Sequence, residues 1–246
     1  MKAMILCAGL GTRLRPWTLH HPKALVPVGG VPMLRRVANT LFQQGFDRIT
    51  VNVHHFASQI RDFIDEGNLP QKDVEISDES DLLLDTGGAI LKASPFLAAD
   101  GEPFLVHNVD ILSDADLSSL YREHQESGRH ITLLVSDRKS DRKLVFSSDM
   151  ELKGWINIKT GQTRPVGLDV SGDDVTLAFS GIYVMSPSVF PIMEGAGFHG
   201  AFPVMDFFLA GIPGLSIAGV RRDNLNIIDI GKPDTLRKAD LDINAG

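Results

Sequence analysis

The sequence predicts an α/β fold, in which a Rossmann-like, mostly parallel sheet carries helices on both faces and a small β-rich flap is attached. Three observations predict it. Strand-like and helix-like segments alternate along the first 135 residues, an order that places successive strands parallel. The first apolar run ends in a glycine-rich loop, which leaves backbone N–H groups accessible at a strand end. The segment 136–175 then breaks the alternation with short strand patterns and turns.

Each element follows from its apolar pattern. Residues Leu34, Val37, Ala38 and Leu41 recur at helical spacing, and similar patterns predict helices at 33–45, 57–66, 87–96, 115–127, 203–210 and from Pro233 onward. Apolar runs predict strands at 3–7, 48–53, 74–77, 104–108, 131–135, 178–184 and 226–230. Two shorter strand patterns, at 143–146 and 152–158, form the flap.

Size and composition limit the possible functions. The 246 residues suit one domain over 1–246, with the flap at 136–175 inside it, and 43% hydrophobic residues allow a buried core. The net charge of −7 argues against binding to nucleic acid. The single cysteine, Cys7, excludes an internal disulfide, and its place in the first strand favours a packing role. Neither a signal peptide nor an apolar run of membrane-spanning length is evident, so we expect a cytoplasmic protein without a membrane partner.

The loop AGLGTRLRP at 8–16, followed by Pro22 and Lys23, is the most specific motif. It lacks the Lys-Ser or Lys-Thr pair of a Walker A loop, and Leu14 stands where a dinucleotide fingerprint needs a small residue. Pro16 obstructs the helix that such a fingerprint would open, so we expect a long, basic, non-helical loop around an anion. The residues expected to contact a nucleotide here are Ala8, Gly9, Gly11, Thr12 and Arg13.

This motif resembles the signature of the sugar-1-phosphate nucleotidyltransferases, or NDP-sugar pyrophosphorylases, in which Gly-x-Gly-Thr-Arg-Leu-x-Pro-x-Thr precedes Pro-Lys and then Pro-Met or Pro-Leu. The likeness extends through most of the chain and is greatest to short bacterial members, among them N-acetylmuramate-1-phosphate uridylyltransferases. It implies an enzyme that forms an NDP-sugar and pyrophosphate from an NTP and a sugar 1-phosphate. It also implies that Arg13 holds the leaving phosphates and that Lys23 offsets charge on the α-phosphate or the sugar phosphate.

The resemblance further implies Mg²⁺ as cofactor, held by Asp110 and Asp229. Asp110 follows an apolar strand, where the pattern alone favours a helix or turn cap. Asp229 opens the element Asp-Ile-Gly-Lys-Pro, which matches the family's Asp-x-Gly-Thr/Lys-Pro. The family usually has glycine just before the first aspartate, and Val109 departs from that pattern.

A second glycine site at 85–88 follows a group of acidic residues and resembles the family's base-reading element. Glycines that open a helix allow a base or ribose to approach closely. The expected contacts are Glu79, Asp85, Gly87, Gly88 and Asn108. A simple helix N-cap by Asp85 or Thr86 is an equally good interpretation of the same pattern.

The acceptor strand of the family resembles residues 179–182, so Ser180 and Gly181 are expected near the sugar phosphate, together with Asp206. The family's Glu-Lys-Pro element is not evident, and Arg142, Lys143 or Lys153 is a candidate to replace its lysine. Trp155 stands in the same region, where packing is favoured over stacking on a sugar.

Two alternatives stay open beside the sugar-nucleotide enzyme. One is a non-catalytic regulatory or binding homologue of the same fold, and the other is a nucleotidyltransferase with a non-sugar phosphate acceptor. UTP is the favoured nucleotide, with dTTP or GTP possible. The partners expected are the NTP and the sugar 1-phosphate, and the chain is expected to be a monomer or a small homo-oligomer.

Overall fold

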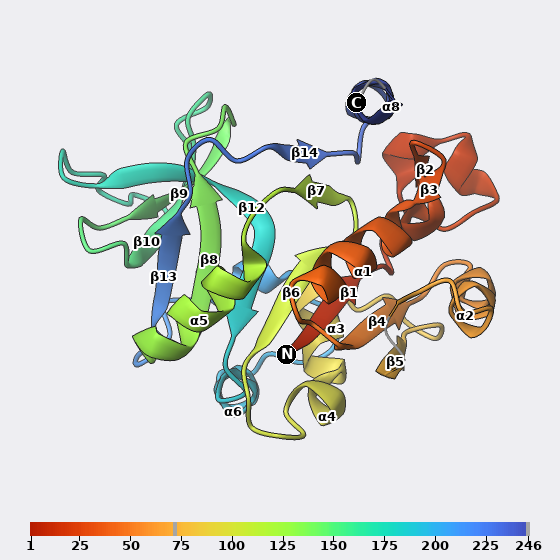
Figure 1. Ribbon diagram of the computed structural model, residues 1–246. Helices are drawn as coiled ribbons and strands as arrows, with labels where there is room; N and C mark the ends of the chain where they lie inside the picture. Colours follow the sequence, from red (N-terminus) through yellow and green to blue (C-terminus); the bar gives the residue numbers. More distant parts are fainter. Residues whose placement is uncertain (71–72, 245–246) are drawn as a thin grey trace.

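A mixed sheet forms the centre of the molecule, with helices on both of its faces (Figure 1). The computed structural model describes residues 1–70 and 73–244, and within these ranges the sheet has 10 strands. The predicted α/β class is confirmed, and alternating side chains of the first strand show the layering. Ala3 and Ile5 enter one core, whereas Met4 enters the other.

The parallel half of the sheet holds four strands in the order β6, β1, β4, β5. They are β6 (Phe104–Asn108), β1 (Lys2–Leu6), β4 (Arg48–Val53) and β5 (Asp73–Asp78). Lys2 pairs in register with both Arg48 and Phe104, so the strands end at one common edge. The strands at 48–53 and 104–108 occupy the predicted residues, because their apolar runs are bounded by polar or turn residues on both sides.

The antiparallel half begins at β12 (Val175–Met185), which pairs with β6, β8 (Ile131–Ser136) and β9 (Arg142–Phe146). The flap consists of β9, β10 (Leu152–Asn157) and β11 (Thr163–Arg164), so the predicted β-rich character of 136–175 is confirmed. The flap continues the main sheet through β12, which is longer than the predicted strand at 178–184. Strand β13 (Ile217–Arg221), which was not among the predicted strands, lies parallel to β8.

Two hydrophobic cores fill the two faces of the sheet. The helices of one face are α1 (Met33–Gln43), α2 (Ala57–Asp65) and α5 (Leu117–Ser127). The other face carries α3 (Asp85–Lys92), α4 (Ser94–Leu97), α6 (Val189–Gly195) and α7 (Val204–Phe208). We call the second one the α3 face.

A two-stranded ribbon stands above the carboxyl end of the sheet, where β7 (Ile111–Ser113) pairs antiparallel with β14 (Ile227–Asp229) (Figure 1). Ile111 lies opposite Asp229, and the Ile230 N–H donates to the Asp110 carbonyl at 2.9 Å. The ribbon therefore brings together two aspartates that are 119 positions apart in the numbering. The chain ends in α8 (Pro233–Asn244), and a short hairpin joins β2 (Pro27–Val28) to β3 (Val31–Pro32).

The prediction of a non-helical glycine loop is wrong. The loop contains three 3-10 turns: η1 (Thr12–Leu14), η2 (Trp17–Leu19) and η3 (Lys23–Leu25). A single 3-10 turn needs only one hydrogen bond between residues three apart, such as Leu14 N–H to the Gly11 carbonyl at 2.8 Å. Pro16 and Pro22 precede two of these turns, where their missing N–H groups cost nothing, so prolines that exclude an α-helix are compatible with 3-10 turns.

The helix predicted at 87–96 starts earlier and is divided. It begins at Asp85, and a new helix starts at Ser94, next to a proline at position 95. The helix predicted at 115–127 starts at Leu117, because Asp116 caps it by accepting from the Ser119 N–H at 2.8 Å.

Candidate functional site

A cavity of about 490 Å³ lies at the carboxyl ends of β1, β4, β5 and β6, where open parallel sheets bind ligands. We call it the glycine-loop cavity. Of the predicted nucleotide contacts it includes Ala8, Gly9, Glu79, Asp85 and Asn108, and it adds Lys23 and Asp110. Five unpredicted neighbours also line it, namely Leu6, Asn52, Leu83, Thr86 and Ala201. Gly11, Thr12 and Arg13 lie in the same loop but not in the cavity wall.

The fold of the glycine loop depends on Gly11. Its φ of +60° favours glycine, and a Cβ there would lie 2.9 Å from the Lys23 Cβ. The Thr18 hydroxyl donates to the Gly11 carbonyl at 2.9 Å and closes the loop on itself. This close packing directs Lys23 toward Asp110, and the two side chains form a largely buried ion pair.

Asp110 and Asp229 converge beside Gly231. A Cβ on Gly231 would stand 2.7 Å from Arg13 Nη2, 2.8 Å from Asp229 Oδ1 and 3.0 Å from Asp110 Oδ2. The Gly231 N–H also donates to Asp229 Oδ1 at 2.8 Å, which fixes that carboxylate. A guanidinium and two carboxylates thus surround one point that only glycine leaves open, and we call this point the carboxylate cradle.

The cradle offers a cation two protein carboxylates. No group of three histidine, cysteine or acidic side chains suited to a metal occurs among residues 1–70 and 73–244. Two carboxylates with room for phosphate oxygens and water match the ligand set that Mg²⁺ takes in phosphate-transferring enzymes. The geometry therefore fits a metal that arrives with, or is completed by, a polyphosphate.

Glu79 and Asn52 form the inner wall of the glycine-loop cavity. Asn52 accepts from the Cys7 N–H at 2.7 Å and donates to Glu79 Oε1 at 2.9 Å, while the Leu84 N–H donates to Glu79 Oε2 at 3.1 Å. Glu79 is fully buried, and burial raises the pKa of its carboxyl group. The sequence offered one signal for Asn52, because it is a polar residue within an otherwise apolar strand.

The structure corrects the interpretation of the second glycine site. The Gly87 and Gly88 N–H groups donate to the Phe202 carbonyl at 2.9 and 3.2 Å, and a Cβ on Gly88 would stand 2.1 Å from the Gly200 carbonyl oxygen. The close approach predicted for a base is thus made by the chain's own backbone. These glycines let α3 pack against the segment before α7 and so shape the cavity from behind.

The alternative interpretation, a helix cap, is also wrong. The N-cap residue of α3 is Leu84, and no side chain caps it. Asp85 is exposed at the cavity edge with a φ of +56°, and Thr86 accepts from the Val204 N–H at 2.9 Å, where α7 begins. Asp85 lines the cavity while its Oδ1 accepts from the Thr86 N–H at 2.6 Å, and the Thr86 side chain joins α3 to α7.

The acceptor strand carries a bulge at Gly181. The pairing of β12 with β8 shifts between Phe179 and Tyr183, and Gly181 has a φ of +80°. A Cβ on Gly181 would stand 2.7 Å from Asn108 Nδ2, so the bulge touches the glycine-loop cavity. The buried Ser180 hydroxyl donates to the Leu134 carbonyl at 2.8 Å, so this side chain is held within the sheet and only its backbone is available at the bulge.

A second cavity of about 460 Å³, which we call the flap cavity, lies between the flap and α7. Its polar and charged lining residues are Arg138, Ser140, Arg142, Lys143, Gln162 and Arg164, and its apolar ones are Leu144, Trp155, Phe179, Met205 and Leu209. Arg142 and Lys143, two candidates for the family's missing lysine, line this cavity. The third, Lys153, instead pairs with Asp174 at 2.6 Å. Asp206, predicted near the acceptor, forms an ion pair at 2.7 Å with Arg164.

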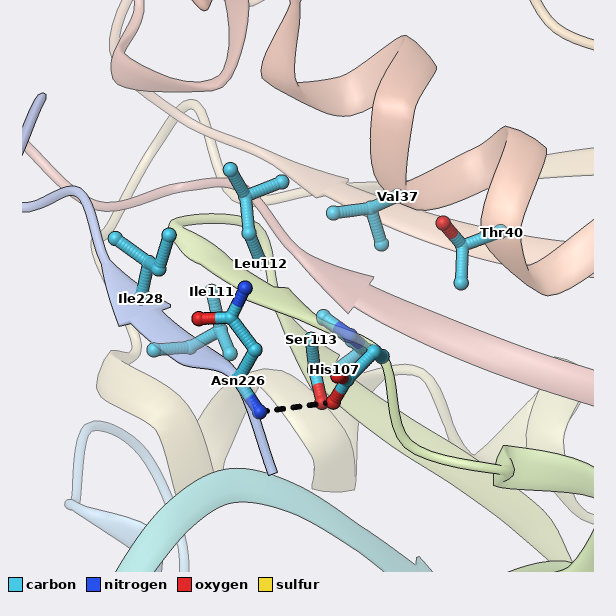
Figure 2. A pocket seen from close by; sticks show the side chains of 9 residues that line it. Val37, Thr40, His107, Ile111, Leu112, Ser113, Asn226 and Ile228 are labelled. Carbon is cyan, nitrogen blue, oxygen red and sulfur yellow. Dashed lines mark hydrogen bonds between the residues drawn. The ribbon is translucent and has the colours of Figure 1, made fainter. Parts of the chain in front are cut away.

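A third cavity of about 310 Å³ lies below the β7–β14 ribbon, on the α1 side of the sheet. Figure 2 shows Val37 and Thr40 of α1 on one side of it and Asn226 and Ile228 on the other. His107 of β6 forms its floor, and burial lowers the pKa of this imidazole to about 4, so the ring is neutral near pH 7. Cys7 is buried nearby in the same core, and burial raises the pKa of its thiol, which agrees with the predicted packing role.

The sequence profile described as "Nucleotidyl transferase" matches residues 2–147. The chain belongs to this family. It is 32% identical over 208 residues to the N-acetylmuramate alpha-1-phosphate uridylyltransferase of Neisseria meningitidis serogroup B, covering 83% of this chain and 84% of that protein. It is 30% identical over 198 residues to the UTP--glucose-1-phosphate uridylyltransferase of Synechocystis, covering 77% of this chain and 50% of that one. The predicted sugar-1-phosphate nucleotidyltransferase family is therefore confirmed.

Solved structures of the same fold support the architecture of this nucleotidyltransferase. HddC from Yersinia pseudotuberculosis, complexed with GMP-PN, aligns with a TM-score of 0.76 at 24% identity and covers 98% of this chain and 99% of its own. UDP-glucose pyrophosphorylase from Acinetobacter baumannii aligns with a TM-score of 0.78 at 19% identity, covering 98% and 92%. In the described part of this nucleotidyltransferase, no helix has the length and apolar character needed to cross a membrane.

Proposed function

We propose that this nucleotidyltransferase couples an NTP, preferably UTP, to a sugar 1-phosphate and releases pyrophosphate, with Mg²⁺ as cofactor. The observation that supports this most strongly is the carboxylate cradle, where Asp110, Asp229 and Arg13 surround one point next to the glycine-loop cavity. The uridylyltransferase of Neisseria meningitidis aligns over 84% of its own length, whereas the matched mannose-1-phosphate guanylyltransferases align over about half of theirs, which favours UTP over dTTP and GTP.

The chemistry needs alignment of two anions more than covalent help from the protein. A phosphate oxygen of the sugar 1-phosphate bonds to the α-phosphorus of the NTP, and the bond from that phosphorus to the β-phosphate bridging oxygen breaks. Pyrophosphate departs with the electron pair. In this reaction Lys23, which lines the cavity, offsets charge on the α-phosphate, and Arg13, which lies at the cradle, binds the leaving phosphates.

Asp110 and Asp229 are the residues that would hold Mg²⁺. When bound there, the ion supplies neutralisation of the charge that develops on the phosphate oxygens. Asn52 and the Leu84 N–H hold Glu79 in place, and this carboxyl group and Asp85 are the acidic groups available to the base. The Gly181 bulge beside Asn108 offers backbone groups to the sugar.

The two alternatives are less well supported. A non-catalytic homologue has no need for both carboxylates and both cations to converge at one cradle, as they do here. A non-sugar acceptor does not explain a second polar cavity with Trp155 in its wall. We also propose that the enzyme acts in the cytoplasm, as a monomer or a small homo-oligomer.

A coupled assay for pyrophosphate tests the proposal. The purified chain is incubated with Mg²⁺ and each of UTP, dTTP, GTP and CTP, against a set of sugar 1-phosphates that includes glucose, N-acetylglucosamine and N-acetylmuramate 1-phosphates. We expect release that requires both substrates and Mg²⁺ and is fastest with UTP. Absence of pyrophosphate under every combination would overturn the proposal, and release without any sugar phosphate would indicate a different acceptor.

A further inference from the structure

The flap cavity has an unusual charge balance. Four of its lining residues are cations, namely Arg138, Arg142, Lys143 and Arg164, and no acidic side chain lines it among the residues that the structure describes. The net charge of the whole chain is −7, so this concentration of positive charge opposes the overall balance of the protein. A cavity of this kind attracts an anion.

The cations are only partly neutralised by the protein. Lys143 lies 3.6 Å from Asp137, a largely exposed carboxylate, and Arg164 pairs with exposed Asp206. The Lys143–Asp137 separation is longer than a hydrogen bond although Lys143 is largely buried, and the Arg164–Asp206 pair is about half exposed and therefore weak, so both cations remain available to a ligand. Neither Arg138 nor Arg142 forms an ion pair with any carboxylate in the described ranges.

Arg138 gives the most specific observation. Its Nη2 donates to the Phe179 carbonyl at 2.8 Å, which fixes the guanidinium at the cavity wall. Its Nε is buried, yet it lacks a hydrogen-bond partner among the described residues. A buried N–H of a charged group without an acceptor is costly, and an anionic oxygen that enters either of the two cavities that Arg138 lines would satisfy it.

The location separates this cavity from the reacting phosphates. The two cavities share no lining residue, but both lie on the α3 face beside the segment that leads into α7. Phe179 lines the flap cavity, and Gly181, two residues further along β12, touches Asn108 of the glycine-loop cavity. Two residues of extended strand span about 7 Å, a distance that one sugar ring with its substituents can bridge.

We propose that the flap cavity binds a second anionic group on the sugar, a carboxylate or a second phosphate, separate from the reacting 1-phosphate. This inference rests on the proposed function and adds the substrate class: an acidic sugar 1-phosphate. Arg138 and Arg142 bind the second anion, because guanidinium groups match the planar or tetrahedral oxygens of such groups. Trp155 and Phe179 provide apolar surface for the sugar ring.

Matched acceptors test this inference. Glucose 1-phosphate is compared with glucuronic acid 1-phosphate and with glucose 1,6-bisphosphate, and N-acetylglucosamine 1-phosphate is compared with N-acetylmuramate 1-phosphate. Each comparison adds one anionic group to the same ring. We expect kcat/KM to be at least about tenfold higher for at least one of the charged acceptors than for its neutral counterpart. The carboxylate and phosphate arms then show which anion the cavity takes.

Substitutions connect the preference to the cavity. Arg142 is exposed at the start of β9, so Arg142→Ala should fold, and we expect it to remove most of the charged-over-neutral ratio while Arg142→Lys keeps part of it. Arg138→Ala should act in the same direction. The control is Lys139→Ala, because Lys139 is an exposed cation that does not line the cavity. The ratio of kcat/KM for charged and neutral acceptors in this variant should match that of the unmodified protein.

Three outcomes would overturn the inference or its basis. Equal kcat/KM for charged and neutral acceptors rejects the second-anion site while leaving the proposed function intact. A loss that is equal for charged and neutral acceptors in Arg142→Ala and Arg138→Ala assigns these arginines to the fold or to the shared 1-phosphate. No pyrophosphate from any acceptor rejects the proposed function itself.

Discussion

The glycine-loop cavity and the flap cavity have similar volumes, about 490 and 460 Å³, but opposite charge. The first places Glu79, Asp85 and Asp110 around a single cation, Lys23, and the second is lined by four cations. Carboxylates repel a bare polyphosphate, so we expect the first cavity to bind a nucleotide well only when a divalent ion enters with it. The flap cavity needs no such ion, because its own side chains supply the positive charge.

The difference separates two tasks on one face of the sheet. In the proposed reaction, the reacting phosphates bind where a metal neutralises their charge, and the acidic substituent of the sugar binds where fixed guanidinium groups hold it. Each of the following predictions tests one side of this division, beginning with the largest effect.

Loss of either cradle carboxylate should have the largest effect. We expect Asp110→Asn and Asp229→Asn each to lower kcat by about 10³-fold or more, since removal of a group that stabilises transition-state charge costs about 4 kcal/mol. Pyrophosphate release measures the rate, and a thermal melt checks that the fold survives. Asp149→Asn, at an exposed flap position, is the matched control. Rates near that of the control in either cradle variant would exclude a metal role for that residue.

Filling the cradle should have the next largest effect. A Cβ on Gly231 would stand within 3.0 Å of Arg13 Nη2, Asp229 Oδ1 and Asp110 Oδ2, so Gly231→Ala must displace at least one of them. Displacement of catalytic groups by about 1 Å costs about 100-fold in rate. The control is Gly172→Ala, where a Cβ would meet no heavy atom within 4 Å in the described chain. Full activity in Gly231→Ala would show that the three groups do not act at this point.

Ligand-induced stabilisation should separate the two cavities without catalysis. At 100 times its Kd, a ligand adds about 2.7 kcal/mol, which raises Tm by about 5–10 °C in a chain of this size. We expect UTP to produce this shift only with Mg²⁺. An acidic sugar 1-phosphate should raise Tm with or without Mg²⁺, to a similar degree. Stabilisation by UTP in excess chelator would contradict the metal dependence assigned to the glycine-loop cavity.

Much of the fold and of the reaction centre followed from local sequence. The strands at 48–53 and 104–108 are apolar runs with clear ends. The proposed catalytic and metal-binding residues belong to short motifs that can be recognised in a single sequence, namely Arg13, Lys23, Asp110 and Asp229. The convergence of the glycine loop with Asp110 could also be expected, because parallel strands place their carboxyl ends at one edge, whereas Asp229 reaches them through the antiparallel β7–β14 ribbon. In these regions the residues that form the sequence pattern are the same residues that form the structural element.

The remaining features depend on partners distant in sequence. Gly87 is needed because Phe202 approaches it, and Arg138 lines the flap cavity because Phe179 accepts its hydrogen bond. Nothing near position 87 or 138 in the sequence identifies these partners. Strand β13 was missed for a similar reason, because its short run, which includes Gly219, becomes a strand by pairing with β8.

The smallest predicted effect is a loss of folding stability at low pH, and it limits the pH range in which the two cavities can be compared. His124 is buried between Thr132 and Ser186, and burial, with a smaller contribution from His130, lowers the pKa of its imidazole to about 4. The imidazole of the unfolded chain therefore binds a proton more readily than that of the folded chain. The stability that the neutral, buried imidazole allows is fully present above pH 6.5 and is lost as pH falls toward 4. At pH 5 the loss should be about 2 kcal/mol for this group, measured as urea unfolding free energy against pH.

The variant His124→Gln should have a lower unfolding free energy at pH 7, and that free energy should change less between pH 6.5 and 4 than in the unmodified protein. An unchanged slope in this variant would contradict the assignment, and charge comparisons between the cavities should therefore be made above pH 6.5.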